Sequence, residues 1–517
     1  MADKPNLLLI TSDQQHWFTL GINNPKIKTP NLDRLAAMGT NFTRAYCPNP
    51  TCTPTRATLI TGQYPSQHGA FTLGTKLPEN VPTLGEYLHD EGYWTALVGK
   101  AHFQPLMNRP ELDCESVESY PLLRDLEFWK TFNDKHTPWY GFDHVETCRN
   151  HTDEGHAGQH YGIWLEEQGL TDWKEYFMPR NDGVKDSNSS KSPSVNKTTH
   201  WELPEDLHYT AWTGKRTIAA IQKAKADNKP FFIWSSYHDP HPPYAVSEPW
   251  ASMYDPEDMP IGHFVEGEFD KMPPPHHMTR EQKPDYSSYN NDTRGNHGYH
   301  SHLHDDEKMK KNMACYYGMI SFMDKWIGKT LDALEDNGMI DNTMIVFTSD
   351  HGHFLGQHGL IAKGPFHYDD VIRVPMLAAW KDKIPAGKVS DDVQSLVDYA
   401  PTFCAAAGME IPRSMSGMNV LNNWTDSKEV RDYAIVENHH QVGPEVHLRT
   451  IVTSDYKLTV YRGRDWGELF DMNKDPNELN NVYDDPSYRD VREMMYRKLA
   501  DAALDAEMTP TARVYGA

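Results

Sequence analysis

The sequence predicts an α/β fold with a central, mainly parallel β-sheet flanked by helices, followed by a smaller C-terminal α+β domain. Short apolar runs alternate with longer segments of helical periodicity, a pattern typical of parallel strands joined by helices. The chain has 517 residues, and single cores stop growing at roughly 250 to 300 residues, so we expect more than one domain. After about residue 421 the pattern changes to successive strands and a final helix.

Four strands of the large domain have the clearest signal, at 6–11, 93–98, 231–235 and 343–348. The first helix is predicted at 30–38, because Thr29 and Pro30 suit its start and Gly39 suits its end. A second helix should begin at Pro54 and stop at Gly62. Further helices are predicted at 84–91, before residue 227 and at 313–335.

The domain boundary is placed where the pattern changes, giving a catalytic domain over 1–425 and a C-terminal subdomain over 426–517. The second part contains predicted strands at 449–453 and 457–461 and a helix at 488–504. Two irregular insertions, at about 105–205 and 250–305, interrupt the first part. Long irregular segments in a compact enzyme usually line or cover a site.

The composition disfavours nucleic acid and membranes as partners. The 73 acidic residues outnumber the 50 Lys and Arg and give a formal charge of -23, which disfavours nucleic acid and anionic membranes. No apolar run approaches the roughly 18 residues that span a bilayer. The first residues leave no room for a secretory signal, so we expect a cytoplasmic protein. The six cysteines lack the spacing of a disulfide or metal framework.

Polar clusters follow each of the four strong strands. In open α/β sheets, ligands bind at the carboxyl edge of the strands, so we expect these clusters to meet there. They are Ser12-Asp13-Gln14, Lys100-Ala101-His102, His238-Asp239-Pro240-His241 and Asp350-His351.

Two of the clusters offer carboxylate, amide and imidazole ligands for one divalent cation. Asp13 and Gln14 come from the first strand, and Asp350 and His351 from the fourth. Each aspartate taken alone would more often cap a loop than bind a metal. The combination favours the metal site.

Cys52 lies in the run Cys-Thr-Pro-Thr-Arg, at the positive end of the predicted second helix and one turn from Arg56. This setting stabilises negative charge on a cysteine. A single cysteine is nevertheless more often a packed small hydrophobe than a nucleophile.

The segment at 52–62, CTPTRATLITG, resembles the signature of formylglycine sulfatases of the alkaline-phosphatase-like superfamily. Further segments resemble sulfatase segments in the same order, so the similarity covers nearly the whole chain except the two insertions. They are ITSDQ at 10–14, TPNLDRLAAMG at 29–39, VGKAHF at 98–103, YHDPHPPY at 237–244, SDHGHFLGQHG at 349–359 and GELFDMNKDPNELNNV at 467–482.

The resemblance implies an alkaline-phosphatase-like fold and a role for each matching residue. Cys52 would be oxidised to formylglycine by a formylglycine-generating enzyme, and its hydrate would attack sulfur beside the metal. The implied metal ligands are Asp13, Gln14, the modified Cys52, Asp350 and His351. The implied catalytic residues are Arg56 and Lys100, which hold the hydrate, His102, which takes its second proton, and His241 and Lys363, which bind sulfate oxygens and one of which assists the leaving oxygen.

The family often has a second Asp where this chain has Gln14, and Asn where it has His351. These changes weaken the preference for a purely hard cation, so we expect calcium first and manganese second. The same ligand set resembles that of phosphonate monoester hydrolases. That subgroup's pattern lacks the pair formed here by Lys100 and His102, which favours sulfate esters.

Weaker signals concern the substrate. His238, Trp129 and His144 are candidates for contacting it. Seven histidines in the second insertion could form another metal site, but their spacing favours a loop over the substrate instead. They are His263, His276, His277, His297, His300, His302 and His304.

The sequence therefore predicts a metal-dependent sulfuric ester hydrolase acting on a small-molecule sulfate, whose aryl, alkyl, choline or sugar part stays open. One alternative is a phosphonate monoester or phosphodiester hydrolase, or an enzyme with both activities. Another is a noncatalytic binding protein that never receives the aldehyde, although every residue needed for catalysis is present. A homo-oligomer is possible.

Overall fold

The computed structural model describes residues 4–112, 114–149, 151, 153, 157–177, 191–193, 199–279, 306–426, 428–439 and 447–507. Within these ranges no helix combines the length and apolar character needed to span a membrane.

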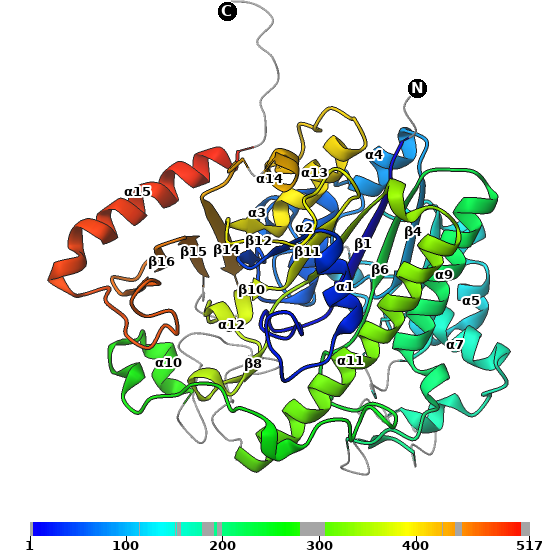
Figure 1. Cartoon of the computed structure of the whole chain (residues 1–517), viewed down its shortest axis with the longest axis horizontal. Helices are drawn as coiled ribbons and strands as arrows, with labels where there is room; N and C mark the ends of the chain where they lie inside the picture. The colour runs from blue at the N-terminus through cyan, green and yellow to red at the C-terminus, as the bar shows by residue number, and fades with distance from the viewer. Residues whose placement is uncertain are drawn as a thin grey trace, which may run out of the picture.

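An eight-stranded sheet forms the centre of the molecule, in the order β12-β2-β11-β7-β1-β6-β4-β5 (Figure 1). All neighbouring pairs are parallel except those made by β11, which confirms a mainly parallel sheet. The strands are β1 (Asn6–Ser12), β2 (Thr40–Phe42), β4 (Trp94–Gly99), β5 (His144–Thr147), β6 (Phe231–Ser236), β7 (Thr343–Ser349), β11 (Met376–Ala379) and β12 (Lys388–Ser390).

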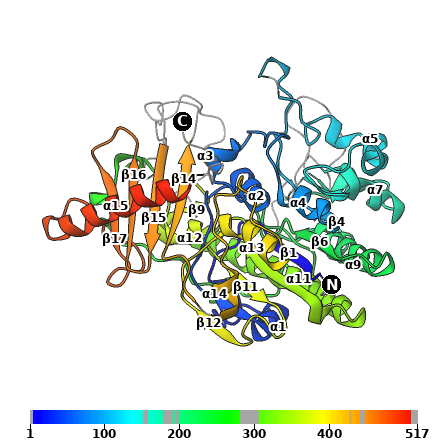
Figure 2. The same cartoon turned by 90° about the horizontal axis from the view of Figure 1, so that it is seen from above.

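Helices cover both faces of this sheet (Figures 1 and 2). Successive side chains of a strand point to opposite faces, so Leu7 and Leu9 enter one core and Leu8 and Ile10 the other. The first core includes residues of α2 (Cys52–Thr61), α4 (Leu84–Asp90) and α13 (Tyr399–Ala406). The second includes residues of α1 (Pro30–Met38), α9 (Tyr209–Ala226) and α11 (Asp306–Asp336).

A four-stranded antiparallel sheet follows in the chain, in the order β14-β15-β16-β17. Its strands are β14 (Tyr433–His439), β15 (His447–Thr453), β16 (Tyr456–Tyr461) and β17 (Gly467–Asp471), and α15 (Arg489–Asp505) lies across them (Figure 2). Ile451 and Leu458 of the sheet pack with Leu499 of the helix. We retain the division into 1–425 and 426–517 as a proposal, because the antiparallel sheet begins at Tyr433.

Smaller elements complete the fold. The remaining helices are α3 (Pro65–His68), α5 (Leu126–Lys130), α6 (Phe132–Lys135), α7 (Gln159–Glu167), α10 (Pro274–Met278), α12 (Asp369–Ile372) and α14 (Leu421–Asp426). The remaining strands are β3 (Ala45–Tyr46), β10 (Arg373–Val374) and β13 (Gln394–Ser395) in one small sheet, and β8 (Phe354–Leu355) and β9 (Ile361–Ala362) in another.

Two helix starts differ from the sequence prediction. Helix α2 begins at Cys52, not at Pro54, so the cysteine itself is in the first turn. Proline is tolerated there because the first N–H groups of a helix have no intrahelical partner. Helix α11 begins at Asp306 rather than near 313, because its first turns are largely charged and exposed and lack an apolar stripe.

Gly99 ends β4 immediately before Lys100 and has φ of 102°, a left-handed value that favours glycine. A Cβ at this position would lie 1.9 Å from the carbonyl oxygen of Ser236 on the neighbouring strand. The close contact between β4 and β6 at this edge therefore requires glycine.

We predict that Gly99→Ala lowers the free energy of unfolding by about 3 kcal/mol, from backbone strain together with steric overlap. The matched control is Gly92→Ala. Gly92 also has a left-handed φ, 84°, but its Cβ would meet nothing within 4 Å, so only the strain of about 1 kcal/mol applies. Urea unfolding of the two variants measures the difference, and equal losses would contradict the steric argument.

Candidate active site

The four polar clusters meet at the carboxyl edge of the large sheet, because β7, β1, β6 and β4 are neighbours there. Backbone hydrogen bonds join the segments that follow the strands. Asp13 N donates to Asp239 O at 3.1 Å, and Asp350 N donates to Ser12 O at 3.3 Å. Lys100 N donates to Ser236 O at 2.9 Å.

Cys52 lies among these clusters, in the first turn of α2, with 1% of its surface exposed. Its Sγ is 3.1 Å from Lys363 Nζ, 3.2 Å from His351 Nε2 and 3.6 Å from Asp13 Oδ1. Burial, together with the nearby Asp13 carboxylate, raises the pKa of the Cys52 thiol. The unmodified side chain is therefore a neutral thiol, which is a poor nucleophile.

Asp13, Cys52, Asp350 and His351 bring their ligand atoms within 4.8 Å of one another and could hold a metal ion. Burial by itself would raise the pKa of Asp13, but the charges of Lys100 and Arg56 hold this pKa well below its ordinary value. Asp13 is therefore an ionised ligand at neutral pH.

Gln14 completes this donor set. Its backbone has a φ of 64°, and its N–H donates to Asp350 Oδ1 at 3.0 Å. Its Nε2 donates to His353 Nδ1 at 2.7 Å, which fixes the amide. Its Oε1 is buried with no hydrogen-bond partner. A buried carbonyl oxygen without a donor is what a cation would satisfy.

Two buried cations lie against the acidic ligands. Arg56 Nε donates to Asp350 Oδ2 at 2.9 Å, and its Nη2 is 3.6 Å from Asp13 Oδ2. Lys100 Nζ forms an ion pair with the same Asp13 oxygen. In the described structure, both side chains are thus bound to the carboxylates of the cluster.

His102 has a φ of 61°, and its N–H donates to Glu118 Oε1 at 3.0 Å. Burial, together with the charges of Arg149 and Lys100, lowers the pKa of His102 well below its ordinary value. Its buried Nδ1 has no hydrogen-bond partner. The imidazole is therefore neutral and can accept a proton.

His241 and Lys363 lie together, and Lys363 Nζ also contacts Cys52 Sγ at 3.1 Å. Lys363 Nζ donates to His241 Nε2 at 3.2 Å. The Nδ1 of His241 therefore has the ring proton and donates it to Pro242 O. Burial lowers the pKa of His241 well below its ordinary value, so Lys363 is the protonated member of this pair.

His151, which sequence reasoning missed, also lies in this cluster. Its ring stacks on that of His241 with centroids 3.4 Å apart. Its Nε2 is 2.6 Å from Lys100 Nζ and 3.3 Å from Asp13 Oδ2. No motif surrounds His151 in the irregular insertion, so only the fold could bring it to the strand ends.

The three weaker candidates have packing contacts. His238 donates through Nε2 to Cys148 O and stacks on Tyr209. Trp129 is 1% exposed in the core, and its Nε1 donates to Leu122 O at 3.0 Å. His144 Nε2 forms a hydrogen bond with Glu146 Oε1 at 3.0 Å. These contacts place none of the three against Cys52.

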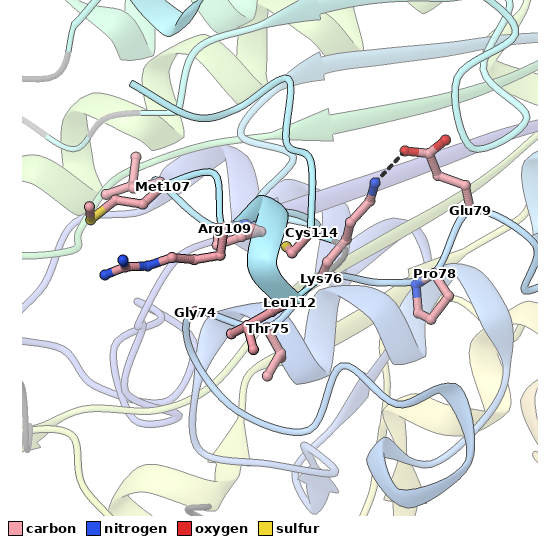
Figure 3. Close-up of a pocket in the computed structure, with 11 residues that line it drawn as sticks. Gly74, Thr75, Lys76, Pro78, Glu79, Met107, Arg109, Leu112 and Cys114 are labelled. Atoms are coloured by element: carbon pink, nitrogen blue, oxygen red, sulfur yellow. Dashed lines mark ion pairs between the residues drawn. The ribbon is translucent and has the colours of Figure 1, made fainter. Parts of the chain in front are cut away.

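A separate pocket of about 710 Å³ lies between segments 74–79 and 105–114 (Figure 3). Its wall includes the Lys76–Glu79 ion pair, at 2.8 Å, and the side chains of Met107 and Leu112. It shares no lining residue with the cluster around Cys52. The chemistry of the strand edge, rather than the size of this cavity, identifies the candidate site.

We predict that Asp13→Asn weakens calcium binding by the metal-free protein at least roughly 10-fold, since even an outer partner of a metal ligand contributes that much. The control is Asp324→Asn, which alters another buried carboxylate, one that accepts the Leu32 N–H at 2.7 Å in α1. Titration calorimetry measures both variants. Equal calcium affinity in Asp13→Asn and the parent protein would exclude Asp13 as a ligand.

Comparisons with known proteins agree with this geometry. The family described as Sulfatase matches residues 5–409, and the family described as N-sulphoglucosamine sulphohydrolase, C-terminal, matches residues 356–505. The chain is 28% identical to an arylsulfatase of Clostridium perfringens (strain 13 / Type A), over 96% of this chain and 94% of that protein. It is also 28% identical to the uncharacterized sulfatase YidJ of Escherichia coli (strain K12), over 96% of this chain and 87% of that protein.

Among solved structures, a phosphonate monoester hydrolase of Agrobacterium radiobacter has the same fold. It superposes with a TM-score of 0.75 at 24% identity, over 98% of this chain and 96% of that chain. The match to the Sulfatase family includes Cys52 and the clusters at all four strand ends. The chain therefore belongs to the sulfatase family and is a hydrolase of sulfate esters.

Proposed function

We propose that this hydrolase acts through a formylglycine made from Cys52, beside one divalent cation. The observation that carries the proposal is the position of Cys52 Sγ, within 3.6 Å of Asp13, His351 and Lys363 in a buried cluster. The buried thiol has a raised pKa and is a poor nucleophile as it stands. An aldehyde hydrate at this position would offer a hydroxyl in its place.

The proposed cation site consists of Asp13, Gln14, Asp350 and His351, with the modified Cys52 as a further ligand. Three oxygen-bearing side chains favour calcium, and the imidazole of His351 keeps manganese as the second choice. When bound, the cation would lower the pKa of the hydrate and stabilise negative charge on the sulfate oxygens.

Reaction would begin with attack of one hydrate oxygen on sulfur, after loss of its proton to solvent, and departure of the ester oxygen. Lys363, as the protonated member of its pair with His241, would give that oxygen a proton, and both side chains would bind sulfate oxygens. The second hydroxyl would then lose its proton to His102. Cleavage of the C–O bond would release sulfate and restore the aldehyde, so no water need attack the crowded sulfur.

The charge of the site suits an anionic substrate. The chain has a formal charge of -23, yet Arg56, Lys100 and Lys363 converge around Cys52. Concentrated cations of this kind stabilise the equatorial oxygens of a sulfuryl group during transfer. We propose a small-molecule sulfate ester as substrate and a formylglycine-generating enzyme as the partner in maturation. We also propose that the chain self-associates into a homo-oligomer.

A second candidate is phosphonate monoester or phosphodiester hydrolysis, because Asp13, Gln14, Asp350 and His351 resemble the ligand set of those enzymes. The pair formed by Lys100 and His102 favours sulfate. His102 has a buried nitrogen free to accept a proton, which suits a base acting on the hydrate.

We predict that the tryptic peptide Ala45–Arg56 of active protein contains an aldehyde at Cys52 and a thiol at Cys47. The two cysteines lie in one peptide, so Cys47 is an internal control for chemical oxidation. Mass spectrometry after alkylation would find the label on Cys47 alone. Active protein with label on both cysteines throughout would contradict the mechanism.

The same mechanism requires Cys52→Ala to lose at least about 10³-fold in sulfatase turnover while staying folded, because the nucleophile is absent. Cys47→Ala is the matched control, since Cys47 is buried with its Sγ 3.8 Å from Val371 O and outside the cluster. It should keep its turnover. Circular dichroism of both variants verifies the fold.

We also predict that kcat/KM for an aryl sulfate exceeds that for the corresponding aryl phosphonate, and that His102→Ala narrows the difference. The first expectation follows from the Lys100 and His102 pair. Steady-state assays of both substrates with both proteins measure it. A parent enzyme that prefers the phosphonate would favour the second candidate instead.

A further inference from the structure

The second insertion contains seven histidines. Their spacing in the sequence favoured a loop that covers the substrate over a metal site. Three of them lie in the described residues, while His297, His300, His302 and His304 lie outside them. His276 contacts Glu468 at 3.3 Å, and His277 contacts Met272 O at 3.2 Å. His263 instead lies close to His358 and Asp370.

We propose that His263, His358 and Asp370 form a second metal site, suited to a zinc-like divalent cation. One ligand atom of each lies within 4.8 Å of the other two. Metal–ligand distances of 2.0 to 2.1 Å in a tetrahedral site place ligand atoms about 3.3 Å apart, so a small inward movement would close the site. The fourth position would be left to water.

Three segments supply these ligands, and the segment of His263 is distant in sequence from the other two. His263 lies in the insertion, His358 in the turn after β8, and Asp370 in α12. The His358 backbone N–H donates to His263 O at 2.7 Å, which holds the two histidines together. Their rings lie nearly perpendicular, with centroids 4.9 Å apart.

His358 is held in a strained position. Its φ is 56°, a left-handed value that costs free energy in a residue other than glycine. Its ring stacks on Tyr368 with centroids 3.7 Å apart, which fixes the direction of the imidazole. The surrounding structure therefore imposes a geometry that the backbone alone would not choose.

The neighbouring groups orient the ligands in the way that metal sites require. Glu268 Oε1 lies 3.4 Å from His358 Nδ1, which leaves Nε2 to face Asp370 Oδ2 at 3.7 Å. The other Asp370 oxygen accepts from His16 Nε2 at 2.9 Å. Carboxylate partners of ligating histidines, and hydrogen bonds to ligating carboxylates, are typical of metal sites.

The His358 imidazole lies between two carboxylates, those of Glu268 and Asp370. In the same cluster His263 Nε2 is buried with no hydrogen-bond partner. A cation between His263 Nε2, His358 Nε2 and the Asp370 carboxylate would have three protein ligands.

The proposed site is distinct from the cation site beside Cys52 and shares none of its ligands. Two nitrogens and one oxygen suit zinc, whereas the oxygen-rich set around Asp13 suits calcium. The two sites are nevertheless linked, because His353 N donates to Asp370 O at 2.8 Å and Gly352 N donates to Val371 O at 2.7 Å. Zinc binding would thus brace the segment that carries Asp350 and His351.

The test measures the zinc content of the full chain without an affinity tag. The protein is incubated with zinc and passed through a desalting column, and the retained zinc is then measured by mass spectrometry of the metal. The Asp13→Asn background weakens the site beside Cys52, and loss of zinc after a further change of His263 or His358 identifies the second site, so the outcome does not depend on the proposed function. We expect one zinc per chain in this background, and none after adding His263→Ala or His358→Gln. His277→Ala, which changes a neighbouring histidine, should keep the zinc.

Cobalt substitution in the Asp13→Asn protein tests the geometry without changing His263 or His358, should those variants fail to fold. A strong visible absorption band of tetrahedral Co²⁺, removed by added zinc, would support the site. The proposal is overturned if the Asp13→Asn protein retains no zinc and gives no such band, or if folded His263→Ala and His358→Gln variants bind as much zinc as the His277→Ala control.

Discussion

The arrangement of the site depends on the contacts that the guanidinium group of Arg56 makes. From helix α2 it reaches the ends of four strands, pairing with Asp350 after β7 and Asp13 after β1. It also donates to Lys100 O at 2.9 Å after β4 and to Ser236 Oγ at 2.7 Å on β6. A planar group with five donors can make these contacts together, which a lysine cannot. Because Cys52 is one turn away, the same contacts fix its distance from the metal ligands.

Burial of these charged side chains costs desolvation free energy, and the ion pairs between them offset that cost. Removal of one partner from a buried ion pair typically costs about 3 to 5 kcal/mol, because the other charge is left uncompensated. Asp13 contacts both Lys100 and Arg56, and Asp350 contacts Arg56. The site is thus a neutralising network in an otherwise acidic protein.

Much of this fold and site could be predicted from the sequence, because its signals are local. The four central strands are apolar runs, and Asp13, Lys100 and Asp350 follow three of them directly, so the adjacency of these strands brings the three residues to one edge. The short edge strands β2 and β12, with three residues each, were missed because they have too few residues for a periodic pattern. His151 could not be predicted, since its approach to Lys100 depends on the path of an irregular insertion. Trp129, in the same insertion, was a candidate for contacting the substrate, but it is buried and packs in the core.

The burial of α2 would determine when the proposed modification of Cys52 can take place. All ten residues of the helix are buried, and Arg56 is fixed by ion pairs on its inner side. An enzyme that acts on Cys52 could not reach it in the finished fold. The proposed oxidation would therefore have to occur while the chain is still unfolded, before Asp350 pairs with Arg56. Modification would then compete in rate with folding, and rapid folding would leave a stable but inactive protein.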